Sequence, residues 1–179
     1  MHKPLTLLTL PALLVLLLFL SGCAILNTST PTNDSTGLYS DDAARASLIS
    51  ALHDKDAKQT SDMAVMCFDA TVFIMGHASK DFQNYAVHTA RKTPGVANVI
   101  THWFASASKD KMEDAAIAAN IDSAIFLDKE LSSTRMAVEV FDGQVILCGV
   151  MKDRNSVNKA IEIARRINKV KSVTSYLSY

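Results

Sequence analysis

The side chains of this chain that could do chemistry are two internal cysteines, four histidines and an aspartate that recurs. Cys67 and Cys148 lie in apolar runs, so we expect both to be buried as small hydrophobic residues. A disulfide or metal ligation stays open as an alternative, because an oxidising compartment would allow either. No Cys-x-x-Cys or His-Glu-x-x-His spacing occurs in the sequence, and such spacing is typical of zinc sites.

The histidines and aspartates form no catalytic pattern either. Gaps of 24, 11 and 14 residues separate the histidines, which match no helical ligand spacing and favour ordinary surface or strand positions over a zinc site. Asp69 and Asp142 are better explained as turn residues than as a carboxylate pair. The sequence therefore predicts no catalytic residue, no metal, no cofactor and no enzyme. Apart from His2 near the N-terminus, the histidines are His53, His77, His88 and His102.

The composition is that of an ordinary globular chain. The 179 residues include 18 Lys+Arg and 18 Asp+Glu, and 49% of them are apolar. These values exclude a disordered chain, a collagen-like repeat and a disulfide-dense scaffold. Because the charges balance, there is no reason to expect nucleic acid as a partner, and any argument from charge has to be local.

The first 22 residues have the three-part layout of a secretory signal. Lys3 gives a basic start, an apolar run extends from residue 5 to residue 20, and small residues precede Cys23. The run is interrupted by Pro11 and is shorter than the roughly 20 residues that a membrane-spanning helix needs. We therefore expect residues 1–22 to be a cleaved signal peptide.

The segment Leu20-Ser21-Gly22-Cys23 resembles the bacterial lipobox, whose cysteine is joined to diacylglycerol and acylated after cleavage. Three acyl chains would make the anchoring at Cys23 effectively permanent. The alternative is an ordinary signal with a chance cysteine. Ala24 follows the cysteine where a retained lipoprotein has aspartate, which by the usual sorting rule implies the outer membrane. Residues 23–40 are mostly small and polar, which predicts a flexible tether.

An internal repeat is the most informative feature of the chain. Residues 65–76 match residues 138–149 at an offset of 73, and after one inserted residue an offset of 74 aligns the parts that follow. A register that holds over about 65 residues indicates two copies of one folding unit. We expect the first copy at residues 41–104, a linker at 105–113 and the second copy at 114–179.

Within each copy, the apolar periodicity predicts the order helix, strand, strand, helix, strand. Apolar residues recur every four positions behind Asp41 in the first copy and Asp114 in the second, as in amphipathic helices. Two alternating runs joined at Asp142-Gly143 predict a hairpin, and Ala70 at the glycine position indicates a less ideal turn in the first copy. The predicted class is α+β, each copy having a three-stranded mixed sheet with two helices on one face.

The second hairpin, Asp142-Gly143-Gln144-Val145-Ile146-Leu147-Cys148-Gly149, resembles the BON-domain pattern Asp-Gly-x-Val-x-Leu-x-Gly. The first copy keeps the later segment Gly95-Val96-Ala97-Asn98-Val99, whereas the second has Lys169 where the pattern has glycine before Val170. A lipobox followed by two such copies is the layout of dual BON-domain outer-membrane lipoproteins. The resemblance implies phospholipid binding and a role in maintaining the outer-membrane barrier.

The segment from residue 152 to residue 171 is strongly basic, with seven bases against two acids. On a helical wheel its apolar stripe leaves one isoleucine at the rim of a basic face. Such a face suits an anionic bilayer, where each base is worth roughly 1 kcal/mol, and a solvated helix face is the alternative. The expected lipid-binding residues are Lys159, Ile163, Arg165, Arg166 and Lys169.

Both faces of the predicted sheets are apolar, although the second face of a two-layer domain is normally polar. Either the other copy or a partner protein must cover the face that lies away from the helices. We expect the two copies to pack together, because a wet surface of this kind would invite aggregation. The side chains expected to be mostly buried there are Phe68, Phe73, Phe141 and Ile146.

These features together predict a non-enzymatic outer-membrane lipoprotein that binds anionic phospholipid through its second copy and supports envelope integrity. The alternative is a protein-interaction module that docks an envelope assembly or cell-division partner through the apolar sheet face or the first copy. Basic residues beside Ile163 favour lipid, whereas the apolar sheet face favours a protein partner.

Overall fold

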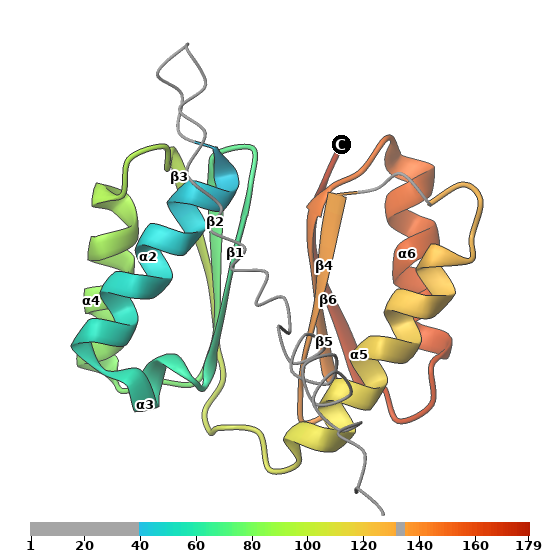
Figure 1. Cartoon of the computed structure of the whole chain (residues 1–179). Coiled ribbons are helices and arrows are strands. Elements are labelled where there is room, and N and C mark those ends of the chain that lie inside the picture. The colour runs from blue at the N-terminus through green and yellow to red at the C-terminus, as the bar shows by residue number, and fades with distance from the viewer. Residues whose placement is uncertain (1–39, 132–134) are drawn as a thin grey trace, which may run out of the picture. The chain divides into compact units, whose positions relative to one another are not determined.

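The computed structural model of the chain describes residues 40–131 and 135–179, all of which belong to one compact unit (Figure 1). The predicted signal peptide, Cys23 and the tether before Ser40 lie outside the described residues. The two copies are called the first and the second repeat below.

Each repeat has the predicted order of helices and strands, and the first repeat has one additional short helix. The first repeat comprises α2 (Asp41–Lys55), α3 (Ala57–Thr60), β1 (Met63–Phe68), β2 (Thr71–Gly76), α4 (Lys80–Lys92) and β3 (Asn98–Trp103). The second repeat comprises α5 (Lys111–Phe126), β4 (Arg135–Phe141), β5 (Gln144–Val150), α6 (Arg154–Arg166) and β6 (Ser172–Ser178). The helix α3 is a single turn capped by Asp56, too short to leave an apolar period in the sequence.

The four long helices begin where a short polar side chain can cap them. The Ser40 hydroxyl accepts a hydrogen bond from the amide of Ala43, and the Asp153 carboxylate accepts one from Ser156. Such a cap satisfies a backbone N–H that has no partner inside the helix. The capping residues are Ser40 for α2, Ser79 for α4, Asp110 for α5 and Asp153 for α6.

Each repeat contains a three-stranded mixed sheet, which confirms the predicted fold class. In the first repeat β1 pairs antiparallel with β2, and β3 pairs parallel with the other edge of β2. The second repeat has the same arrangement of β4, β5 and β6. Figure 1 shows α2 and α4 on one face of the first sheet, and α5 and α6 on one face of the second.

An aspartate in the first turn of the first helix clamps the hairpin of each repeat. Asp41 accepts hydrogen bonds from the amides of Asp69, at 2.8 Å, and Ala70, at 2.9 Å. Asp114, at the equivalent position, accepts from Asp142 at 2.8 Å and from Gly143 at 2.9 Å. Both aspartates were expected to favour the helix N-terminus, and the structure gives them this further role in tying helix to turn.

The apolar residues form a core between helices and sheet in each repeat. In the first repeat Leu48 and Leu52 of α2 are fully buried against β2 and α4. In the second repeat Ile121 of α5 and Leu147 of β5 are equally buried. The four-residue periodicity noted in the sequence therefore marks the core-facing stripe of α2 and α5.

The two sheets bury their second faces against each other, as expected. Phe73 and Met75 of β2 and Ile146 and Cys148 of β5 form a third buried cluster, with exposed fractions of 4% or less. Phe68 is partly buried around this cluster. Because the other repeat covers the apolar sheet face, that face is not available to a partner in this structure.

Polar contacts flank this interface between the sheets. Lys111 of the second repeat forms an ion pair with Asp62 of the first at 2.6 Å, and Arg135 forms another with Asp69. Within the interface, the rings of Phe104 and Phe141 are stacked with centroids 4.5 Å apart. Phe141 is only partly buried, which places it at the margin of the buried cluster.

Candidate membrane-binding surface

The helix α6 carries only part of the basic segment that the sequence singled out. It ends at Arg166, and Lys169 lies in the turn before β6 with a φ of +70°. Lys169 is therefore not on the helical face where the wheel placed it. Ala160 and Ala164 are fully buried, which confirms the core stripe on the opposite side of α6.

Acidic side chains engage three of the four bases in the expected lipid-binding set. Lys159 lies 2.9 Å from a carboxylate oxygen of Asp128 and 2.9 Å from one of Glu130, and these hydrogen bonds raise the pKa of Lys159. Arg166 pairs with Glu162 one turn earlier, and Lys169 pairs with Glu113 of α5. The surface is thus less positive than the count along the segment indicated.

The two remaining members of the expected lipid-binding set, Arg165 and Ile163, form no ion pair with an acidic side chain of the described residues. Arg165 is exposed and has no ion-pair partner among residues 40–131 and 135–179. Ile163 is partly buried and packs against the core of the second repeat, so its side chain contributes to packing as well as to the rim. The structure brings α5 beside α6, and α5 supplies the apolar surface that Ile163 alone does not.

The outward face of α5 is apolar and was not identified from the sequence. Met112 is 84% exposed and Phe126 is 77% exposed, and Leu127, just after the helix, is 78% exposed. At about 100° per residue, Met112 and Phe126 lie within about 40° of each other on the helix. Along the line between them the exposed side chains are small and uncharged, namely Ala116, Ala119 and Ser123, and the exposed Asn120 and Asp122 flank this line on its two sides.

A helix that is apolar on its outward face as well as its core face needs a further partner. The core stripe of Ile117, Ile121 and Ile125 accounts for one side of α5. Phe126 and Leu127 follow that stripe directly, so they cannot lie on the same side. The sequence contains the evidence for this second apolar face, but Ile125, Phe126 and Leu127 form one apolar run that does not separate the core-facing residue from the two outward ones.

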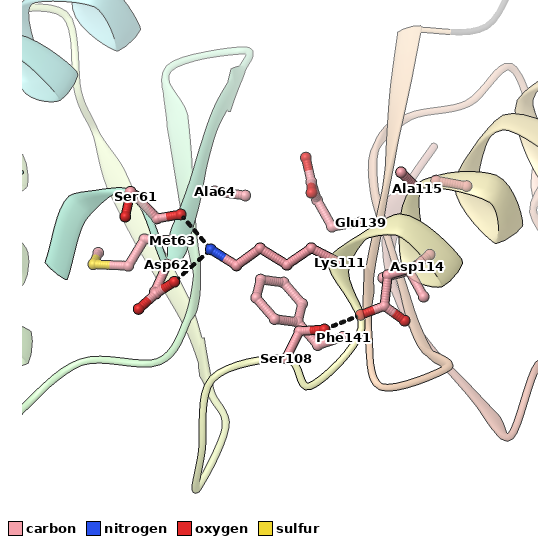
Figure 2. A pocket seen from close by; sticks show the side chains of 12 residues that line it. Ser61, Asp62, Met63, Ala64, Ser108, Lys111, Asp114, Ala115, Glu139 and Phe141 are labelled. Atoms are coloured by element: carbon pink, nitrogen blue, oxygen red, sulfur yellow. Dashed lines mark hydrogen bonds and ion pairs between the residues drawn. The ribbon is translucent and has the colours of Figure 1, made fainter. Parts of the chain in front are cut away.

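A pocket of about 220 Å³ lies between β1 of the first repeat and α5 and β4 of the second (Figure 2). The Lys111 ammonium reaches across it to Asp62 and to the carbonyl of Ser61, and Ser108 donates to Asp114. Burial raises the pKa of Glu139, whose side chain also lines the pocket. Lys111 and Asp114 are engaged in structural bonds, so these lining residues do not bring a nucleophile and a base together.

The internal cysteines and histidines also occupy structural positions. Cys67 and Cys148 are buried and unpaired, and burial raises the pKa of each thiol to about 12. His102 donates to or accepts from the Tyr176 hydroxyl at 2.9 Å across the two repeats. Among the described residues no group of three or more His, Cys, Asp or Glu side chains could hold a metal ion. In that same part of the chain, no helix combines the length and hydropathy needed to span a bilayer.

The model of the BON domain matches this chain twice, at residues 40–102 and at residues 113–179. The chain belongs to the BON-domain family. The two repeats are therefore BON domain 1 and BON domain 2, and the family assignment made from the hairpin pattern is confirmed. A relative, the Osmotically-inducible protein Y of Escherichia coli (strain K12), is 26% identical over 169 residues, which cover 84% of each chain.

Two solved structures resemble the chain weakly. One is the C-terminal domain of CdsD, the structural protein of the type III secretion system of Chlamydia trachomatis, with a TM-score of 0.31 and 11% identity. The other is a second structure of CdsD, with a TM-score of 0.32 and 10% identity. Each match covers 77% of this chain, and covers 66% and 62% of the respective CdsD chains.

Proposed function

We propose that this chain is a non-enzymatic, lipid-anchored protein of the outer membrane that binds anionic phospholipid through BON domain 2 and supports envelope integrity. The observation that carries the proposal is the outward face of α5. This face presents Met112 and Phe126 at its two ends and the small, uncharged side chains of Ala116, Ala119 and Ser123 between them. A bilayer surface is a suitable partner for such a face, because the apolar side chains can enter the boundary between headgroups and acyl chains.

Exposed bases of α6 and of the turn that follows it supply the preference for anionic lipid. Arg165 is exposed and unpaired among the described residues, and Arg166 and Lys169 are also exposed. Their acidic partners Glu162 and Glu113 are more than 40% exposed as well, so these ion pairs are weak and can exchange for lipid phosphates. Lys159, held by two carboxylates, contributes less than the sequence alone indicated.

Vesicle flotation tests the surface with two matched substitutions. Ala119→Glu places a charge in the middle of the outward face of α5, and Ala46→Glu makes the same change at the equivalent exposed position of α2. For residues 33–179, we expect Ala119→Glu to reduce binding to anionic vesicles by about tenfold or more, since burying an unpaired charge is costly. Ala46→Glu should bind as the unsubstituted chain does. Equal binding by all three proteins would exclude this face.

A second flotation series tests the charge. Arg165→Glu combined with Arg166→Glu should reduce binding to anionic vesicles by about thirtyfold, at roughly 1 kcal/mol for each of the two lost bases, and leave the weak binding to neutral vesicles unchanged. Raising the salt concentration should reproduce the effect in the unsubstituted protein. If the double variant bound anionic vesicles normally, the bases would be a solvated surface.

The proposed anchor is tested separately at Cys23. Cys23→Ala in the full chain should abolish acylation and release the protein from membranes, because a single cysteine carries all of the acyl chains in the lipobox scheme. Mass spectrometry of the mature protein and fractionation after a high-salt wash are the measurements. A Cys23→Ala chain that stayed with the outer membrane would contradict the anchor.

A further inference from the structure

A second surface, in BON domain 1, has features that lipid binding does not use. An open groove of about 490 Å³ runs between α4 and the edge strand β3. Its α4 side carries Lys80, Asn84, His88 and Arg91, which recur at helical spacing along one stripe. Its β3 side is formed by Thr101 and Trp103.

The groove is basic, and its cations have no acidic partners. No aspartate or glutamate lines it, and neither Lys80 nor Arg91 takes part in an ion pair among residues 40–131 and 135–179. BON domain 2 differs at the position equivalent to His88, where Glu162 interrupts the stripe of α6. A stripe that carries bases and no acidic residue is thus a property of the first domain.

No strand of the described part of the chain pairs with the outer edge of β3, the strand beside this groove. β3 is the last strand of its sheet, and the amides of Asn98 and Phe104 both donate toward β2. Because backbone groups alternate in direction along a strand, those of Val99, Thr101 and Trp103 point away from the sheet. An extended peptide could pair with these groups, as in recognition by β-strand addition.

We propose that an extended, acidic segment of a partner protein adds to the open edge of β3 and places alternate carboxylates over the basic stripe of α4. Alternate side chains of an added strand lie on the helix face of the sheet, which is the face that α4 covers. From Lys80 to Arg91 the helix rises about 16 Å, the length of about five strand residues. Two or three carboxylates at alternate positions therefore match the stripe.

Peptide titration of the full chain tests this surface, because Trp103 is the one tryptophan of the sequence and reports on the groove. The probe is an eight-residue peptide with blocked ends, glutamates at alternate positions and valine or threonine between them. We expect saturable binding with a shift in Trp103 fluorescence. Lys80→Glu with Arg91→Glu should weaken it by about tenfold or more, since two attractions become repulsions. Lys58→Glu with Lys92→Glu, an equal charge change outside the groove, should weaken it less than threefold.

Two further measurements separate strand addition from simple charge attraction. A probe methylated at alternate backbone nitrogens keeps its carboxylates but cannot complete the ladder, so it should bind at least about tenfold more weakly. Thr101→Pro should have the same effect on the unmodified probe, because it removes an outward amide and leaves the pairing with β2 intact. Equal binding of the methylated probe, no saturable binding up to about 1 mM, or self-association of the chain in place of peptide binding would each overturn the proposal. None of these results bears on the lipid surface of BON domain 2.

Discussion

At the residue scale, one non-glycine residue in each domain holds a left-handed backbone conformation that its counterpart achieves with glycine. Ala70 has a φ of +58°, where BON domain 2 has Gly143. Lys169 has a φ of +70°, where BON domain 1 has Gly95. A residue with a Cβ pays about 1 kcal/mol or more in this region. Of these two equivalent pairs of positions, each domain therefore has glycine at one and a strained residue with a Cβ at the other.

We expect Ala70→Gly to stabilise the protein by about 1 kcal/mol, because it relieves this strain at the second turn residue. The gain is reduced by the extra freedom that glycine has in the unfolded chain. Gly143→Ala is the reverse substitution at the equivalent position of BON domain 2. It should destabilise the protein by more than about 1 kcal/mol, since the new Cβ would also lie 2.8 Å from the Lys169 carbonyl oxygen. Urea unfolding measures both. A destabilising Ala70→Gly would show that the turn is not strained.

Gly149 shows the stricter requirement of close backbone approach. A Cβ at this position would lie 2.3 Å from the carbonyl oxygen of Arg135 on the neighbouring strand, and φ is +138°. We expect Gly149→Ala to destabilise BON domain 2 by about 3 kcal/mol or more, because β4 would have to move away from β5. A loss below about 1 kcal/mol in urea unfolding would mean that the sheet can relax at this point.

At the element scale, the aspartate clamp couples the first helix of each domain to its hairpin. Partial burial alone would raise the pKa of Asp41, but the amides of Ala70 and Asp69 outweigh it and hold the pKa below its ordinary value. A carboxylate whose pKa is lower in the folded than in the unfolded protein stabilises the fold above the unfolded pKa. That stabilisation is lost as the pH falls through the folded value.

We therefore expect Asp41→Asn to cost about 1 kcal/mol at pH 7 and to cost less at pH 3, because the stabilisation declines as the pH falls below the ordinary aspartate pKa of 3.8 and toward the lower folded value. Asp42→Asn serves as the control, since Asp42 is exposed and its neighbour Asp41 accepts the bonds from the hairpin. Urea unfolding at the two pH values gives the difference. A cost that did not change with pH would show that the charge of Asp41 does not stabilise the turn.

At the scale of the whole molecule, the packing of sheet against sheet buries one thiol, whereas the core of a single domain buries the other. Cys148 belongs to the cluster between the sheets, whereas Cys67 belongs to the core of BON domain 1. The two thiols therefore report on different events. Separation of the sheets exposes Cys148, and unfolding of BON domain 1 exposes Cys67.

We expect Phe73→Ala, which removes a ring from the cluster between the sheets, to weaken that packing by about 3 kcal/mol. It should accelerate alkylation of Cys148 far more than that of Cys67. Leu48→Ala, in the core beneath α2, should do the reverse. Pulse labelling followed by peptide mass spectrometry locates the modified cysteine. If Phe73→Ala accelerated both thiols equally, the sheets would not separate before the protein unfolds.

The amino-acid sequence by itself determined the repeat, the αββαβ order and the burial of both sheet faces, because these follow from local periodicity and from the register of two matching segments. It also marked Ala70 and Lys169 as departures from glycine, and both occupy left-handed backbone. Residue types that recur at fixed spacing carry this information without reference to distant parts of the chain.

The tertiary structure decided what covers each surface and which charges remain free. Asp128 and Glu113 come from outside the basic segment, and only folding brings them to Lys159 and Lys169. A count of charges along one segment cannot include partners that are distant in sequence, because ion pairing depends on distance in space. For the same reason, the pairing of β2 with β3 and the packing of α4 beside that strand, which create the open basic groove, could be read only from the folded chain.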